Sequence, residues 1–306
     1  MIRGYQMVNR IREQGYRPLI QPSKRQSAWR SIADNAFAMV RRRRATKVFG
    51  LFTFAILGGH SVWLVSQILF AKASGDVSLQ ALGTGAILGD TREVLASFFS
   101  IQFFVMALAI AALGAGIVAD DIENDVLSVY FSRRIPPQHY LQGKLAALGA
   151  VPLVGFVAPG LILWFIAIGI SPEILRGTLW AVVLPTIGVG AVGAVVLTLP
   201  MLALSSILSS HRSTSVIYLS LFLFAAPVME GLARSGYGWL GYLSPERSFR
   251  AVVTWALEPE QTVAGQLFDM RSGAELESVA VAGLALIVFA GASAVLAHLG
   301  LKRRIQ

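Results

Sequence analysis

The chain has 306 residues, of which 55% are hydrophobic and 14% are charged, and it contains no cysteine. Soluble domains carry about a quarter charged residues, so this chain has too few to cover a water-facing globule of its size. The lack of cysteine excludes disulfide frameworks, thiolate zinc sites, iron–sulfur clusters and thiol nucleophiles. The net charge of +9 would suggest nucleic-acid binding in a soluble protein, so its placement along the chain decides its meaning.

Six apolar runs are long enough to cross the hydrocarbon core as helices, for which about 20 residues suffice. Almost no ionisable residue interrupts them, and a backbone in lipid must satisfy its own hydrogen bonds, so we predict an all-α membrane protein. A capping-box pattern of Asp90 with Glu93 predicts that the second run starts near Thr91. The predicted spans are residues 48–71, 94–119, 145–170, 179–208, 216–233 and 279–301.

These spans divide the chain into a basic leader (1–47), a six-span membrane domain (48–301) and a short tail (302–306). If the N-terminus is cytoplasmic, most of the 26 lysine and arginine residues fall on the inner side of the membrane. The positive-inside rule therefore predicts a multi-pass protein of the inner (plasma) membrane with both termini in the cytoplasm. This placement explains the basic charge, so we expect no nucleic-acid partner.

The leader contains an apolar stripe at helical spacing, with polar residues on its other side. The pattern predicts an amphipathic elbow helix whose aromatic face enters the inner leaflet, followed by arginines 41–44 at the anionic headgroups of membrane lipids. The alternative is a plain cationic topology signal. The stripe consists of Trp29, Ile32, Ala33, Ala36, Phe37 and Val40.

Motifs for enzyme chemistry are missing from the sequence. There is no Gly-x-x-x-x-Gly-Lys-Ser/Thr phosphate loop and no Gly-x-Ser-x-Gly elbow, and the four histidines form no His-Glu-x-x-His pair. An intramembrane enzyme would need converging catalytic groups inside the spans, and the spans lack such a cluster. We therefore expect no catalytic, cofactor or metal site in this chain.

The most informative stretch runs from Ala119 to Lys144, between the second and third spans. Four acids gather at a predicted helix start, where the helix dipole favours anions: Asp120, Asp121, Glu123 and Asp125. An apolar face follows, formed by Ile122, Val126, Val129 and Tyr130. Arg133 and Arg134 come next, and Pro136-Pro137 stops the helix. Such a short amphipathic helix can dock into a groove on a cytoplasmic partner; the alternative is a solvated connector.

This stretch resembles the first intracellular loop of ABC-2-type transporter permeases. The family pattern is an acidic cluster, Gly-Thr-Leu, an apolar triplet, Ser-x-Pro-hydroxyl-Arg and a terminal Gly-Lys. The matching residues are Asp120, Glu123, Leu127, Val129-Tyr130-Phe131, Ser132, Tyr140 and Gly143-Lys144. In this chain Asp125 stands at the family's glycine position and Arg134 at its proline position. The six spans and the amphipathic leader also agree with the family plan.

The resemblance implies a permease subunit of an ATP-driven transporter, with export as the family's usual direction. It implies pairing with a second permease, either an identical or a related chain, above two ABC ATPase subunits that bind ATP and Mg. This chain would then be no enzyme. The alternatives are a membrane anchor or assembly component of a larger complex, and an intramembrane enzyme. The implied ATPase-coupling residues are Asp120, Asp121, Glu123, Val126, Leu127, Tyr130, Ser132, Arg133, Arg134 and Lys144.

The connection between the fifth and sixth spans, residues 234–277, is long for a compact bundle. Ser244 can cap a helix that starts at Pro245, and apolar residues follow at helical spacing before Pro259. The helix is too short to cross the bilayer, so we predict that it lies in or dips into the outer leaflet. A small water-exposed cap is the alternative. By analogy with the re-entrant outer helices of the family, the outer gate candidates are Phe249, Val252 and Trp255.

Overall fold

The computed structural model describes residues 28–73, 85–132, 135–171, 179–257 and 278–305, and these residues form helices and no strand. The prediction of an all-α protein is therefore confirmed. The first helices are α2 (Ala28–Arg42), α3 (Arg44–Ala73), α4 (Gly85–Gly114), α5 (Gly116–Glu123), α6 (Val126–Ser132) and α7 (Pro137–Ile170). The later helices are α9 (Val183–Ile207), α10 (His211–Leu223), α11 (Ala225–Arg234), the 3-10 helix η1 (Gly238–Leu243), α12 (Pro245–Leu257) and α14 (Val279–Ile305).

Six helical stretches of the described chain are long and apolar enough to cross a membrane, which identifies a multi-pass membrane protein. They agree in number and order with the six predicted spans. The stretches are Arg44–Leu69, Thr91–Glu123, Pro137–Ile170, Val183–Ile207, His211–Ala233 and Val279–Arg304.

Two predicted helix boundaries are wrong. The helix of the second span begins at Gly85 rather than near Thr91, so Asp90 does not stand at its start. The third span begins at Pro137, eight residues before the predicted start at Leu145. A proline suits the first position of a helix, because its φ is already helical and its missing amide hydrogen would have no partner there. Pro136-Pro137 therefore starts α7, where the sequence pattern had suggested only a stop.

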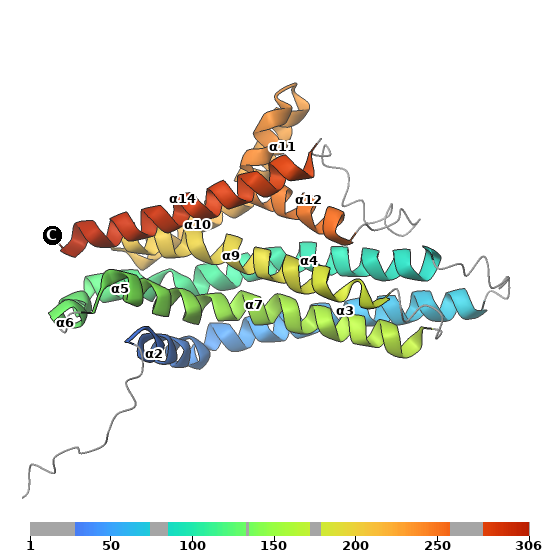
Figure 1. The fold of residues 1–306 in the computed structure, drawn as a ribbon, viewed down its shortest axis with the longest axis horizontal. Coiled ribbons are helices and arrows are strands. Elements are labelled where there is room, and N and C mark those ends of the chain that lie inside the picture. Colours follow the sequence, from blue (N-terminus) through green and yellow to red (C-terminus); the bar gives the residue numbers. More distant parts are fainter. Residues whose placement is uncertain (1–27, 74–84, 133–134, 172–178, 258–277, 306) are drawn as a thin grey trace, which may run out of the picture.

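The centre of the bundle is formed by α4 and α9 (Figure 1). Most residues of these two spans are buried, and they pack against α7, α10, α12 and α14. Few residues are buried in the first, fifth and sixth spans, which keep large apolar side chains exposed along their length. This distribution is typical of helices that face lipid, because the hydrocarbon around them accepts apolar side chains.

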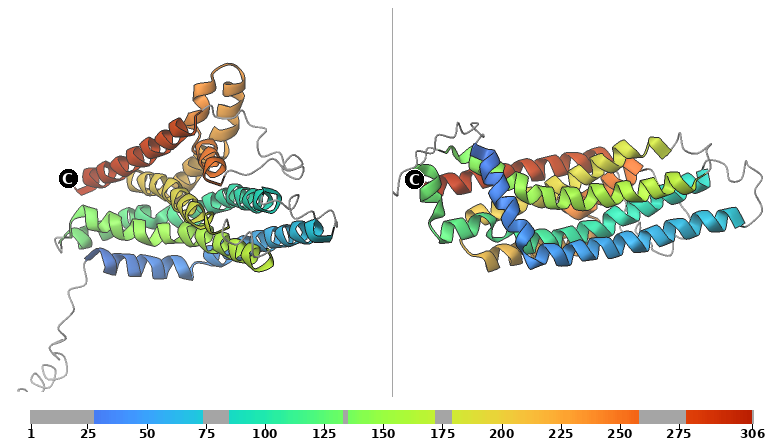
Figure 2. Two further views of the ribbon diagram at one scale, coloured as in Figure 1. Left: turned by 45° about the vertical axis from the view of Figure 1, so that its right-hand side comes forward. Right: turned by 90° about the horizontal axis from the view of Figure 1, so that it is seen from below.

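The helices α2, α5 and α6 and the C-terminus lie together at one end of the bundle, which we call the C-terminal end (Figure 1). Figure 2 shows α2 crossing the start of α7 at this end. The two backbones approach closely at Gly143, where an added Cβ would lie 2.7 Å from Ile32 Cγ2 and 2.8 Å from the carbonyl oxygen of Trp29. Only glycine fits such a contact without a shift of the helices.

The amphipathic helix is present as predicted, but its apolar face is divided between two environments. Ile32, Ala36 and Val40 are buried against the protein, whereas Phe37 remains exposed. The apolar stripe is therefore shared between the protein and the exposed surface, and entry of the aromatic face into the leaflet stays a prediction. The i, i+4 row of the helix packs on α7 because Gly143 leaves room for it.

Candidate functional site

The acidic helix α5 is fastened to α7 by a buried ion pair. Asp121 Oδ2 accepts a hydrogen bond of 2.6 Å from the Tyr140 hydroxyl and lies 2.7 Å from Lys144 Nζ. The Lys144 side chain is only 4% exposed, so its charge depends on this carboxylate for compensation. Tyr140 and Lys144 are four residues apart, so they lie on the same face of α7, and both contact the Asp121 carboxylate.

A tight turn separates α5 from α6. Asp125 has φ +53°, and it is the single non-glycine residue with positive φ in the described part of the chain. Asparagine and aspartate tolerate this left-handed conformation better than most residues, although glycine adopts it most readily. The Asn124 side chain donates to the carbonyl of Asp120 and the Ser128 hydroxyl donates to the carbonyl of Asp125, which stabilises the turn on both sides.

The tyrosine of α6 is half-buried and contacts two other helices. The Tyr130 ring lies 5.4 Å from the Tyr140 ring, and its hydroxyl forms a hydrogen bond with Asn35 of α2. Burial and the charge of Asp121 raise the pKa of Tyr130 above its ordinary value, although the bond to Asn35 acts in the opposite direction. Tyr130 is therefore neutral at physiological pH and links α6 to both α2 and α7.

The outward surface of the α5–α6 segment is consequently different from the predicted apolar face. Leu127 is buried, Val126 and Tyr130 are half-buried, and Val129 is the apolar residue that points outward, with 55% exposure. Polar and acidic residues surround it. The exposed surface of the segment consists of Glu123, Asn124, Asp125, Ser128, Val129 and Ser132.

Other predicted residues of this segment have weaker roles or lie outside the described residues. Asp120 is 3.5 Å from Arg43, but both side chains are well exposed, so the pair contributes little to stability. Arg133 and Arg134 lie outside the described residues. Asn35 and Arg43 also belong to the site, but no local pattern marks them, because their partners are 70 or more residues away in the chain.

The predicted short helix between the fifth and sixth spans is present as α12. The Ser244 hydroxyl accepts a hydrogen bond from the Arg247 amide and Pro245 is the first helical residue, as the capping pattern predicted. The helix packs against α4, α9 and α14. Its apolar face is therefore buried in the protein and does not face lipid, while the position of the helix in the outer leaflet stays a prediction.

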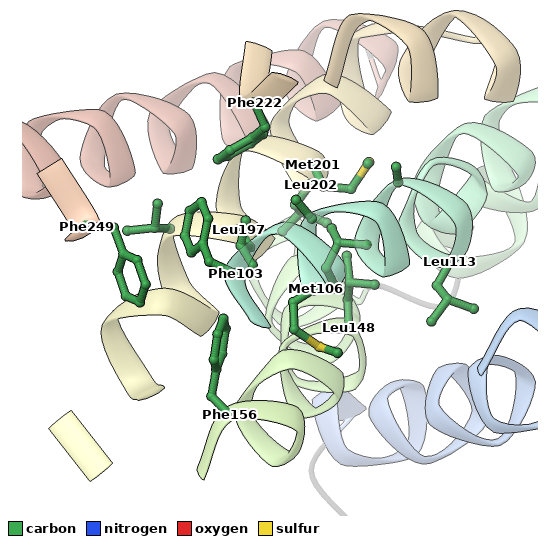
Figure 3. Packing of buried hydrophobic residues seen from close by; sticks show 14 of the residues in the cluster. Phe103, Met106, Leu113, Leu148, Phe156, Leu197, Met201, Leu202, Phe222 and Phe249 are labelled. Carbon is green, nitrogen blue, oxygen red and sulfur yellow. The ribbon is translucent and has the colours of Figure 1, made fainter. Parts of the chain in front are cut away.

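Phe249 is the largest apolar side chain that α12 buries, with 1% exposure (Figure 3). Its ring stacks on Phe103 of α4 at 4.5 Å and lies 6.1 Å from the Phe156 ring of α7. Gly193 of α9 makes room for it, because an added Cβ there would lie 3.1 Å from the Phe249 ring. We call Phe249 with the buried Val253 the α12 insertion.

The three outer gate candidates are separated by the helix geometry. Phe249 is in the core and Val252 is half-buried beside it, whereas Trp255 is 63% exposed on the other side of α12. Trp255 therefore takes no part in the α12 insertion. Among the described residues, no group of three histidine, cysteine or acidic side chains is placed to hold a metal ion.

Neutral polar side chains lie between α3, α4 and α7, in the interior of the bundle. The Gln102 side-chain amide donates to the Thr53 hydroxyl at 2.9 Å and to the Gly155 carbonyl at 3.0 Å. His60 Nε2 is 3.3 Å from the Ser97 hydroxyl. Interhelical hydrogen bonds of this kind hold membrane helices together, since hydrocarbon offers polar groups no other partner.

No protein-family model and no curated protein matches this chain.

Proposed function

We propose that this protein is the permease subunit of an ATP-driven transporter, and that its α5–α6 segment docks an ATPase subunit. The observation that carries the proposal is the turn at Asp125. This residue stands where the resembling permease loop has glycine, and its backbone adopts the left-handed conformation that glycine favours. The match is one of backbone geometry at a stated position, which supports the resemblance independently of side-chain identity.

The surroundings of the turn support a docking role as well. The α5–α6 segment presents Val129 within a polar and acidic surface, while Asp121, Lys144 and Tyr140 fix the segment to α7 from behind. A partner that pushes on the exposed side would therefore move α7. In this proposal the protein lies in the plasma membrane, and the C-terminal end of the bundle faces the cytoplasm.

The transporter would contain a second permease, identical or related, and two ATPase subunits, with ATP and Mg held by the ATPases. In this transporter the α12 insertion would act as a gate on the outer side of the substrate path, away from the ATPase subunits. Phe249 fills the space between α4, α7 and α9, so its withdrawal would open the bundle toward the outside. We propose export as the direction and leave the substrate open.

The test is site-directed photo-crosslinking in native membranes. Because the chain has no cysteine, a Val129→Cys variant can be labelled with a benzophenone at this single position. The expected product is a crosslink to a protein that hydrolyses MgATP, recovered with the tagged chain under mild detergent. A Val129→Glu variant should lose the co-purifying ATPase activity, because a carboxylate would be buried against the partner.

Met39 provides a matched control, since it is an exposed apolar residue of α2 at the same end of the bundle. A Met39→Cys probe should give no crosslink to the ATPase, and Met39→Glu should keep the co-purifying activity. If the tagged chain carries no ATP hydrolysis and Val129→Cys gives no crosslink to a nucleotide-binding protein, the transporter proposal is wrong and a membrane anchor becomes the better account.

A further inference from the structure

Ser205 of α9 uses its full hydrogen-bonding capacity on the backbone of another span. Its hydroxyl accepts hydrogen bonds from the amides of Val118 and Ala119, each at 3.0 Å, and donates to the carbonyl of Ala115 at 2.9 Å. A serine hydroxyl has one donor and two acceptor positions, and all three are occupied here. The side chain is completely buried.

These three backbone groups lie where the second span changes from α4 to α5. The helix α4 ends at Gly114 and α5 begins at Gly116. In an uninterrupted α-helix, the amides of residues 118 and 119 bond to the carbonyls of residues 114 and 115. Insertion of a side chain into this ladder is one of the recognised causes of a helix kink. Ser205 occupies such a position at the junction.

Two further side chains bond to carbonyls of the same stretch. The Ser215 hydroxyl of α10 donates to the carbonyl of Ala111 at 3.0 Å. The Arg43 guanidinium, at the corner between α2 and α3, donates to the carbonyl of Leu113 at 3.2 Å. The stretch from Ala111 to Ala119 is therefore held by polar side chains from three other parts of the molecule.

The two sides of the junction are fastened differently. On the α4 side, Gly114 is packed so closely that an added Cβ would lie 2.6 Å from Met201 Cγ and 2.8 Å from Leu148 Cδ2, both shown in Figure 3. On the α5 side, Asp121 is bound to α7 through Lys144 and Tyr140. The junction thus connects a tightly packed helix to a segment that is anchored elsewhere.

We propose that residues 111–119 form a hinge between the core of the bundle and the α5–α6 segment, and that Ser205 is its positioning residue. The hydroxyl bonds to three backbone groups at the junction of α4 and α5, so these groups need no water in a dry interior. Its role in carrying ATPase motion to α9 rests on the proposed function, but the hinge itself is a property of this chain alone.

Amide hydrogen exchange of the full chain in lipid nanodiscs tests the hinge directly. In Ser205→Ala, the amides of Val118 and Ala119 lose their partner, and their exchange should accelerate about tenfold. Ser206→Ala is the matched control. Ser206 is the next residue and is equally buried, but its hydroxyl donates to the carbonyl of Ala203 within its own helix. The control should leave exchange at residues 118 and 119 unchanged.

A distance measurement gives a second readout that a loss of global stability would not mimic. Nitroxides at Ser128→Cys on α6 and Arg303→Cys on α14, both exposed, report the position of the α5–α6 segment. The distance distribution should broaden in Ser205→Ala and stay narrow in Ser206→Ala. Ser215→Ala, at a partly exposed position, should broaden the distribution less. This variant still tests the hinge if Ser205→Ala does not fold.

Unchanged exchange at Val118 and Ala119 in folded Ser205→Ala, or an unchanged distance distribution in both serine variants, would overturn the hinge. Either result stands whether or not an ATPase binds. Conversely, absence of the Val129 crosslink would defeat the transporter proposal while leaving the exchange result intact. The two proposals therefore fail in different experiments.

Discussion

The α5–α6 segment and the α12 insertion are held in the bundle by different kinds of interaction. The segment is fixed by directional contacts, namely the buried Asp121–Lys144 pair, the Tyr140 hydroxyl and the Ser205 hydrogen bonds. The α12 insertion is held by apolar contact, with Phe249 stacked on Phe103. Separating a buried ion pair leaves charges without compensation, whereas separating aromatic rings leaves no unsatisfied polar group.

In the proposed transporter, this difference would decide which parts move together and which parts separate. The α5–α6 segment should move together with the start of α7 as one body, since each internal contact has a high cost of breaking. Withdrawal of the α12 insertion would cost free energy in proportion to the apolar area that it exposes. Directional contacts at the C-terminal end would thus transmit the motion of a docked ATPase, and apolar contacts at α12 would allow the bundle to open there.

The largest effect is expected from the ion pair. Asp121→Asn leaves the buried ammonium of Lys144 without a counter-charge and should lower the free energy of unfolding by about 3–5 kcal/mol. Asp120→Asn makes the same chemical change one residue earlier, at an exposed pair, and should cost at most about 1 kcal/mol. Thermal unfolding in nanodiscs measures both. Equal losses in the two variants would show that α5 is not anchored by Asp121.

The α12 insertion offers the second comparison. Phe249→Ala removes a ring from a filled core position and should cost about 3 kcal/mol, because the cavity only partly closes. Trp255→Ala, on the exposed side of the same helix, should change stability by less than about 1 kcal/mol. Thermal unfolding again provides the measurement. A larger loss for Trp255→Ala would mean that α12 buries its other face.

The contact between α2 and α7 gives a third, smaller effect. Gly143→Ala forces the added Cβ against Ile32 and the Trp29 carbonyl, and should cost about 1–3 kcal/mol through overpacking. Gly169→Ala lies in the same helix with nothing within 4 Å of the added Cβ, so it should be neutral or slightly stabilising. Amide exchange in α2 should rise in the first variant alone. Equal exchange in both would contradict the close crossing.

The features that the sequence predicts correctly are those that depend on local pattern. The six apolar runs set the number of spans, and Ser244 with Pro245 sets the start of α12. A capping pattern alone can mislead. Asp90 resembles a cap for a helix that starts at Thr91, but α4 begins six residues earlier, at Gly85. A capping residue inside a continuous apolar helix has no influence on where the helix begins.

Features that depend on which helices meet could not be predicted. Helical spacing places Val126, Val129 and Tyr130 on one side of α6, but it does not say which of them faces a neighbour. Tyr130 turns inward because Asn35 and Tyr140 are there to receive it, from segments far away in sequence. Ser205 looks like an ordinary serine in an apolar run, and its role becomes visible only when α9 lies against the junction of α4 and α5.

The smallest effect concerns the turn at Asp125 and sharpens the comparison with the resembling permeases. A residue with a Cβ at φ +53° is strained, and aspartate reduces the strain only in part. Asp125→Gly should therefore be neutral or stabilise the protein by up to about 1 kcal/mol, despite the general cost of glycine in the unfolded chain.

Asp125→Val, a β-branched residue in the same conformation, should lower the free energy of unfolding by about 1–2 kcal/mol. Val129 serves as the reference: Val129→Gly replaces a residue inside α6 and should destabilise the helix by about 1 kcal/mol. Denaturant unfolding of the three variants measures the sign of each change in the free energy of unfolding. A loss of stability in Asp125→Gly as large as that in Val129→Gly would show that the turn does not adopt the left-handed conformation. The α5–α6 turn would then no longer match the glycine position of the permease loop.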